Sequence, residues 1–194
     1  MPGSISLEEF LSCASQLTEI SDSISDGWTH KNKEVPEASY LMKRIVLPDF
    51  EDKSDTSAAL LPLEEPLDKA LEDDNAIAAP QSRVLTWEYH VLYSASYAVP
   101  TLYFNVWKED GSLLSLDQIW QRVQENFQQQ DRWSVLTQQE HPILRRPFYM
   151  LHPCRTGEFL DNFKGKSANI LVTWLSSVGP AVGMTLPAQY GSVT

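Results

Sequence analysis

Cys154 is the residue of this sequence whose surroundings best suit chemistry. It follows His152 and Pro153 in the segment LHPCRTGEF, residues 151–159. Proline has no N–H and a φ fixed at about −65°, and it restricts the preceding histidine to extended backbone. Such a segment holds a side chain in one direction, which suits a nucleophile. It is also common where an ordinary strand passes into a loop.

The spacing around Cys154 excludes several kinds of cysteine chemistry. A phosphatase loop needs an arginine at the position occupied here by Leu160, and a thioredoxin-like site needs a second cysteine in a C-x-x-C motif. Zinc sites use a closed set of nitrogen and sulfur ligands. The other cysteine is Cys13, and the histidines at positions 30, 90, 141 and 152 have no ligand spacing. There is no phosphate-loop or dinucleotide motif, so we expect no metal and no cofactor.

Three histidines could still assist Cys154 in the folded chain. A Cys–His hydrolase needs a base beside the thiol, which His90 or His141 could supply, although no papain-like or caspase-like signature is present. His152 would share a strand face with Cys154 if the strand continued that far, because side chains alternate along a strand. There it could assist the thiol or serve as an ordinary structural residue.

The composition favours one folded domain and disfavours some partners. The chain has 194 residues, 42% of them hydrophobic, and a net charge of −11, which argues against nucleic acid or an anionic membrane as the main partner. Residues 47–80 hold ten Asp/Glu and two Lys, so −8 of the −11 lies there. We expect residues 1–194 to form a single domain. Within it, the acidic residues 49–82 are expected to be a flexible insertion, because they cannot bury enough apolar surface to become ordered.

The sequence also indicates where in the cell the protein is expected. The N-terminal segment MPGSISLEEF is acidic and amphipathic, unlike a secretory signal, and no apolar run approaches the ~20 residues of a membrane span. We therefore expect a cytoplasmic protein with free thiols. Cys13 lies beside the apolar stripe of a predicted helix, which is typical of a structural cysteine.

The elements that must position Cys154 follow from hydrophobic periodicity and turn residues. Helices are expected at residues 7–20, from Ser115 onward and at 170–178, and strands at residues 39–48, 84–94, 100–107 and 147–151. Ser6 with Glu9, and Ser115 with Gln118, have capping-box spacing. The short connection that contains Tyr97 predicts a hairpin. This order predicts an α+β domain with an antiparallel sheet flanked by helices.

Several segments together resemble a known family. They are EYHV at 88–91, PTLY at 100–103, QQEHP at 138–142, LHPCRT at 151–156, WL at 174–175 and VGP at 178–180. From about residue 84 to its end the chain resembles the family of autophagy-related protein ten, which are E2-like conjugating enzymes. The family of autophagy-related protein three is related to it and shares the His-Pro-Cys segment. The resemblance implies an E2-like (UBC-like) core.

The resemblance also implies a reaction with particular partners. Members of the family accept the ubiquitin-like autophagy protein twelve from its activating enzyme, autophagy protein seven, as a thioester on the cysteine that matches Cys154. They then transfer it to a lysine of autophagy protein five. Tyr97 and His152 match positions near that cysteine and are expected to support the reaction. Ordinary ubiquitin E2 enzymes carry His-Pro-Asn ahead of the cysteine, whereas Ile143 follows Pro142 here, so the group that stabilises the oxyanion is not identified.

Two other classes of function stay open at this point. A non-catalytic E2-like or RWD-like interaction module would need only the fold and its exposed loops. A cysteine hydrolase would need a base beside Cys154. Replacement of Cys154 by serine separates these classes, because only a conjugating enzyme would trap a modifier there as an oxyester.

Overall fold

The computed structural model describes residues 3–49, 84–127 and 136–193. Apart from Asp49, the expected insertion at 49–82 lies outside these ranges. The helices are α1 (Leu7–Ile24), α2 (Leu116–Phe127), α3 (Thr156–Asp161) and α4 (Ile170–Val178), and the 3-10 turns are η1 (Pro36–Ala38), η3 (Pro153–Arg155), η4 (Gly179–Val182) and η5 (Ala188–Val193). The strands are β1 (Thr29–Lys31), β2 (Tyr40–Pro48), β3 (Val84–Ser94), β4 (Val99–Trp107), β5 (Leu136–Glu140) and β6 (Pro147–Leu151).

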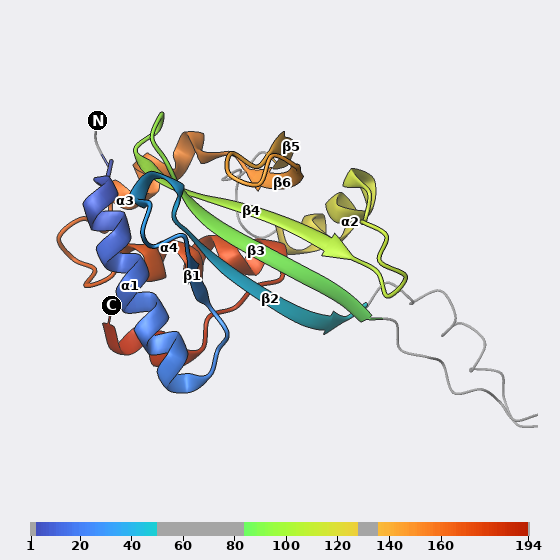
Figure 1. Ribbon diagram of the computed structural model, residues 1–194, viewed down its shortest axis with the longest axis horizontal. Coiled ribbons are helices and arrows are strands. Elements are labelled where there is room, and N and C mark those ends of the chain that lie inside the picture. Colours follow the sequence, from blue (N-terminus) through green and yellow to red (C-terminus); the bar gives the residue numbers. More distant parts are fainter. Residues whose placement is uncertain (1–2, 50–83, 128–135, 194) are drawn as a thin grey trace, which may run out of the picture.

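Six strands of the described ranges form one antiparallel sheet in the order β1-β2-β3-β4-β6-β5. In Figure 1, α4 lies behind this sheet and α1 lies beside its β1 edge. Helices therefore flank an antiparallel sheet, which confirms the predicted α+β, E2-like fold. None of the described helices is long and apolar enough to cross a membrane.

Local side-chain bonds fix where the two long helices begin. Ser6 Oγ accepts the Glu9 N–H at 3.0 Å at the start of α1. At the start of α2 the bonds are reciprocal: the Ser115 N–H donates to Gln118 Oε1 at 3.0 Å, and the Gln118 N–H donates to Ser115 Oγ at 3.3 Å. Each bond satisfies a backbone donor that lacks an intrahelical acceptor. The capping box predicted at Ser115 and Gln118 is confirmed in full, and that predicted at Ser6 and Glu9 is confirmed for the Ser6 side chain.

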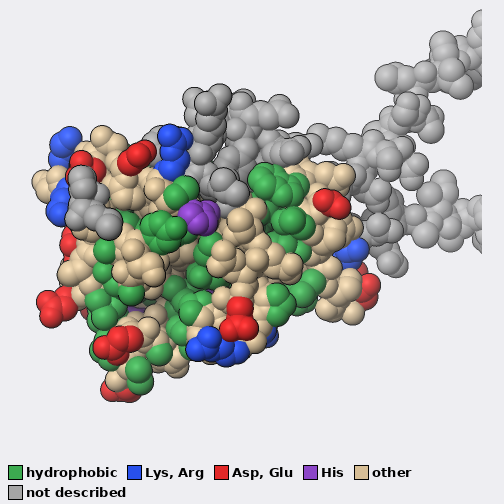
Figure 2. Space-filling view, turned by 90° about the horizontal axis from the view of Figure 1, so that it is seen from above, with side chains coloured by type: hydrophobic (Ala, Val, Ile, Leu, Met, Phe, Trp, Pro, Cys, Tyr) green, Lys and Arg blue, Asp and Glu red, His purple; other side chains and the backbone are tan. Residues whose placement is uncertain are grey.

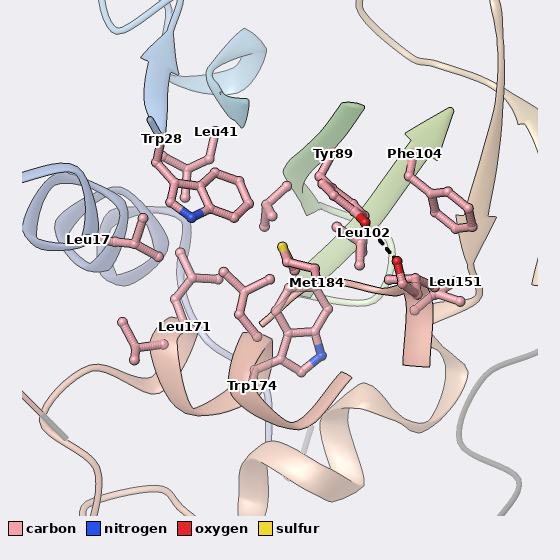
Figure 3. Close-up of a cluster of buried hydrophobic side chains, with 14 of the residues drawn as sticks. Leu17, Trp28, Leu41, Tyr89, Leu102, Phe104, Leu151, Leu171, Trp174 and Met184 are labelled. Carbon is pink, nitrogen blue, oxygen red and sulfur yellow. Dashed lines mark hydrogen bonds between the residues drawn. The ribbon is translucent and has the colours of Figure 1, made fainter. Parts of the chain in front are cut away.

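The main core lies between the sheet and the helices. Leu41, Val91, Leu102 and Leu151 are paired in register across four strands, so their side chains share one face. That face packs against residues of α1 and α4, of which Leu17, Leu171 and Trp174 are shown with the strand residues in Figure 3. Burial of this apolar surface is the main stabilising contribution to such a domain.

Asn169 joins the two helices that cover this core. Its side-chain oxygen accepts the N–H groups of Leu171 and Val172 at 3.1 Å each and so caps α4. Its amide nitrogen donates to the carbonyl oxygen of Cys13 in α1 at 3.0 Å. Cys13 itself is buried, as expected of a residue beside the apolar stripe of α1, and burial raises the pKa of its thiol.

The opposite face of the sheet carries a second, aromatic cluster. Its buried members are Tyr40, Leu92, Tyr103, Phe148 and Met150. The turn between β5 and β6 packs on this cluster through Ile143 and Leu144. The sheet is therefore apolar on both faces near β6, the strand that runs into Cys154.

Candidate active site around Cys154

Cys154 lies in the turn that follows β6, and its thiol is free and exposed. Strand β6 ends at Leu151, and residues Pro153–Arg155 form the 3-10 turn η3. The prediction that His152 and Cys154 share a strand face is therefore wrong, because the backbone turns at Pro153 instead of continuing the strand. His152 and Cys154 are nevertheless close to each other, because a hydrogen bond joins the His152 ring to the Cys154 backbone.

His152 holds the backbone of Cys154. It is the residue that caps η3, and its Nδ1 accepts the N–H of Cys154 at 3.2 Å. A nitrogen that accepts a hydrogen bond carries no proton, so the neutral ring has its proton on Nε2. His152 thus contacts Cys154 through the main chain. Its Nε2–H lies on the opposite side of the imidazole ring from Nδ1.

Tyr97 occupies that other side. Its hydroxyl oxygen lies 3.5 Å from His152 Nε2, at the outer limit of a hydrogen bond. The two rings meet edge to face, with centroids 5.6 Å apart and planes at 81°. With the His152 proton directed at the Tyr97 oxygen, the Tyr97 hydroxyl proton can point elsewhere. The expected trio of Cys154, His152 and Tyr97 is brought together here.

The turn that carries Tyr97 is a tight one between β3 and β4. Ala98, the next residue, has a φ of 53°, which is the left-handed region that non-glycine residues rarely adopt. Tyr97 is 42% exposed although it is a large aromatic residue. A strained turn that presents an exposed aromatic ring beside a free cysteine is typical of a functional site.

His90 and His141, the candidate bases of a hydrolase, are engaged away from Cys154. His90 Nδ1 lies 3.0 Å from His141 Nε2, and His90 Nε2 lies 3.3 Å from Glu88 Oε1. His141 Nδ1 accepts the N–H groups of Ile143 and Leu144 at 3.2 and 3.1 Å. Both rings therefore have their polar neighbours on the aromatic face of the sheet.

These contacts fix the tautomers along a buried chain. His141 Nδ1 is an acceptor, so its Nε2 carries the proton and donates to His90 Nδ1. The proton of His90 is then on Nε2 and faces the Glu88 carboxylate. We call Glu88, His90 and His141 the histidine relay.

The pKa is lowered at both ends of the histidine relay, but for different physical reasons. Burial lowers the pKa of His141 to about 4, and the nearby His90 and Arg146 act in the same direction. Burial alone would raise the pKa of Glu88, but hydrogen bonds from His90 and Arg44 overcome it and lower that pKa to about 2. Arg44 and Arg146 both donate to the Glu88 carboxylate. Near neutral pH, His141 is therefore neutral and Glu88 is ionised.

Sequence reasoning named His90 and His141 but missed their contact with each other. The two residues are 51 positions apart, and no periodicity links them. The signal available was local: both lie in strands or turns rich in aromatic residues, where a buried histidine needs a hydrogen-bonding partner.

Figure 2 shows the molecule from above the view of Figure 1, where the turn between β3 and β4 projects. Hydrophobic side chains, other uncharged side chains and backbone cover most of the middle of this face. Lysine, arginine, aspartate and glutamate lie toward its margins, and a histidine lies between. A face of this kind suits contact with another protein more than with a polyanion.

The fold and the exposed cysteine after β6 define an E2-like domain, and comparison with known proteins gives the family. Residues 9–189 match the family described as autophagocytosis associated protein, active-site domain. The chain belongs to this family.

Its relatives include three enzymes named ubiquitin-like-conjugating enzyme ATG10. The human one is 46% identical over 144 residues, which cover 69% of this chain and 66% of that enzyme. The Arabidopsis thaliana one is 32% identical over 163 residues, covering 77% and 72%. The Dictyostelium discoideum one is 34% identical over 122 residues, covering 54% and 53%. The chain thus spans just under two thirds of the human relative's length.

Proposed function

We propose that this chain is an E2-like conjugating enzyme of autophagy, which carries a ubiquitin-like modifier as a thioester on Cys154. One observation carries the proposal: an exposed cysteine follows a core strand of an E2-like sheet, and its N–H is held by His152. Membership of an active-site domain family and relatives named as conjugating enzymes support it.

In the first step Cys154 takes the modifier from an activating enzyme. Its thiolate attacks the thioester carbonyl, a new carbon–sulfur bond forms, and the activating enzyme's thiolate leaves and takes up a proton. The exposure of Cys154 suits this step because two large proteins must bring their sulfur atoms together. The bond energy is already stored in the thioester, so the step is an exchange between similar bonds.

In the second step a lysine of an acceptor protein takes the modifier. The neutral amine attacks the thioester carbonyl, an amide bond forms, the amine loses a proton, and Cys154 leaves as its thiolate. The carbonyl oxygen gains negative charge on the way, and a positioned donor lowers that barrier. Tyr97 is the donor we assign, because the His152 proton faces its oxygen and leaves its own proton to point at the oxyanion.

The finer assignment of partners rests on the family resemblance. We propose the ubiquitin-like autophagy protein twelve as the modifier, autophagy protein seven as the activating enzyme and autophagy protein five as the acceptor. No cofactor is part of this proposal, and the proposed location is the cytoplasm. The mostly uncharged face in Figure 2 supports a protein partner there.

The test is thioester formation with purified proteins. The chain is incubated with the activating enzyme, the modifier and ATP, and then run on a gel with and without reductant. A band that gains the mass of the modifier and disappears on reduction supports the proposal. A non-catalytic interaction module or a cysteine hydrolase would give no such band, and Cys154→Ser would trap no oxyester in either case.

A further inference from the structure

We propose that residues 3–6, which we call the N-terminal strap, position Tyr97 and Cys154 relative to each other. The strap contacts both the turn that carries Tyr97 and the helix that follows Cys154. The role in catalysis rests on the function proposed above, whereas the contacts themselves are properties of the fold.

The first side of the strap is bound to the β3–β4 hairpin through the backbone of Ile5. The Ile5 N–H donates to the carbonyl oxygen of Ala98 at 2.9 Å, and Ala98 directly follows Tyr97. The Ile5 carbonyl oxygen accepts the hydroxyl of Tyr93 at 3.0 Å. Ile5 is also 5% exposed and belongs to the main core. The strap therefore holds the base of the Tyr97 turn at two points and is itself anchored.

The second side of the strap is pressed against α3. Gly3 has a φ of +73°, and a Cβ placed on it would overlap the carbonyl oxygen of Gly157 and lie 3.0 Å from the backbone nitrogen of Asp161. Gly157 is in the first turn of α3, three positions after Cys154. The carbonyl oxygen of Ser4 also accepts the Lys164 ammonium at 3.3 Å. Only a residue without a side chain fits so close to α3.

The strap thus forms a second bridge between two elements that the sheet already joins through the β4–β6 pair Leu102–Leu151. Tyr97 is one residue from the Ala98 carbonyl, and Cys154 is three residues from the Gly157 carbonyl. The direct contact between them, Tyr97 oxygen to His152 Nε2, is long at 3.5 Å. The β4–β6 pairing ends at Leu102 and Leu151, short of both Tyr97 and Cys154, so the spacing of these two residues also depends on a further contact. The strap supplies it, and Ser6 fixes the strap to α1 by capping that helix.

The sharpest variant is Gly3→Ala. It adds a methyl group where Gly157 leaves no room, so the strap or α3 must move. We expect modifier loading on Cys154 to be close to that of the unchanged chain, and single-turnover discharge to be about ten- to a hundred-fold slower, since small misplacements of reacting groups have effects of this order.

Gly111→Ala is the matched control. Gly111 has a φ of +79°, but no atom lies within 4 Å of the position that a Cβ would take there. The substitution therefore introduces the same backbone strain without the steric contact. Gly111 lies in the turn after β4, away from α3. Equal slowing of discharge in both variants would show a general loss of stability and would overturn the proposal.

A second pair of variants avoids steric effects in case Gly3→Ala does not fold. Tyr93→Phe removes the hydroxyl that holds Ile5, whereas Tyr89→Phe removes a hydroxyl that donates to the carbonyl oxygen of Val182 at 2.7 Å. Both delete one bond from a tyrosine of β3 to a carbonyl. Slower discharge in Tyr93→Phe than in Tyr89→Phe is expected, and the reverse order would contradict the strap's role.

Two measurements that do not depend on enzymatic activity test this inference separately from the proposed function. Loosening the strap should speed hydrogen exchange at the Ile5 N–H and weaken the proton–proton cross-relaxation between the Tyr97 and His152 rings. If the unchanged chain never loads a modifier, these two measurements still test the strap. If both stay unchanged in Gly3→Ala and Tyr93→Phe, the strap does not position the two residues.

Discussion

Cys154 and Cys13 show how position separates two chemically identical side chains. Cys154 is exposed after a strand, with its N–H bound to His152. Cys13 is buried between helices, and burial raises the pKa of its thiol. Since the thiolate is the nucleophile, only Cys154 combines access with a fixed backbone.

We therefore predict that Cys154→Ala abolishes the reducible adduct with the modifier and that Cys13→Ala keeps it. The physical reason is that Cys13 cannot be reached by a second protein without opening the core. Gel analysis with and without reductant measures both variants. An adduct that persists in Cys154→Ala would place the thioester elsewhere.

We further predict that Tyr97→Phe and His152→Ala slow transfer to the acceptor more than loading. Loading is a thioester exchange in which a strongly nucleophilic thiolate attacks, so it should depend less on these two side chains than attack by an amine does. Transfer needs a held oxyanion, and loss of one donor in a buried site costs ~2.7–4 kcal/mol; because Tyr97 is 42% exposed, we expect a smaller effect of roughly tenfold or more. Preloaded enzyme is mixed with acceptor, and thioester loss is followed over time.

His152→Asn serves as the control for that experiment. An asparagine oxygen can still accept the Cys154 N–H, but the side chain is too short to replace the ring contact with Tyr97. Partial recovery by His152→Asn would assign part of the effect to the backbone bond. Discharge at the unchanged rate in both Tyr97→Phe and His152→Ala would make the pair scaffolding only.

At the scale of elements, those with strong local signals could be predicted from the sequence. The β3–β4 hairpin, the starts of α1 and α2, and α4 lie where alternation, capping pairs and the Gly179–Pro180 stop place them. Strands β1 and β5 were missed, since β1 has three residues and β5 contains the polar run Gln138–Glu140. Edge strands of this kind carry no apolar alternation, because only one of their sides is paired and little of them is buried.

In the candidate site, too, local features could be predicted from the sequence and tertiary contacts could not. The sequence led to Cys154 and, through the resemblance, to Tyr97 and His152, but not to how they meet. The bond from the Cys154 N–H to His152 depends on the turn at Pro153. The strap contact at Gly3 joins residues more than 150 positions apart. Tertiary contacts of this kind leave no periodic trace in a sequence.

The histidine relay should make stability depend on pH. In the unfolded chain His141 takes up a proton near its ordinary pKa of 6.5, whereas in the folded chain it stays neutral down to about 4. Between these values the unfolded state binds more protons, so the free energy of unfolding falls as the pH falls. At ~1.4 kcal/mol per pKa unit, the full loss is on the order of 3 kcal/mol. Glu88 adds to the loss only below its ordinary pKa of 4.5.

Urea unfolding at several pH values between 4.5 and 7 measures this loss. His141→Phe keeps a ring against Phe148 but cannot be protonated, so its stability should be lower overall and flatter with pH. Burial also lowers the pKa of His30, but less than that of His141, so His30→Gln is the control that should keep most of the slope. An unchanged slope in His141→Phe would place the titration elsewhere.

At the scale of the whole molecule, the acidic insertion joins two strand ends that already lie together. Pro48 of β2 pairs with Val84 of β3. The segment between them, which contains the expected insertion 49–82, therefore begins and ends at neighbouring positions of the sheet. Asp49 should be retained when this segment is replaced, because both its carboxylate oxygens accept hydrogen bonds from Arg122.

We predict that replacement of residues 50–83 by Asn-Gly leaves the melting temperature unchanged or slightly higher. With Asp49 kept, Asp49-Asn-Gly makes a three-residue hairpin loop ending in glycine between the paired Pro48 and Val84, and a shorter loop has a smaller closure entropy. Thermal unfolding followed by circular dichroism measures the change. A Gly/Ser segment of the original length is the control that separates length from content, and a large fall in both variants would reveal a folded element in the insertion.

Asp26 accepts from Lys43 of β2 at 2.6 Å and from the Tyr190 hydroxyl of η5 at 2.8 Å, and α1 packs on both α4 and η5. The layer that covers the sheet is thus assembled from segments far apart in the sequence (Figure 1). During synthesis on the ribosome, the half-buried Asp26 carboxylate lacks one donor and α1 lacks its neighbours until residues near 190 have left the exit tunnel. We therefore predict that folding of this domain waits for the emergence of η5, and that a nascent chain stalled before η5 remains sensitive to protease.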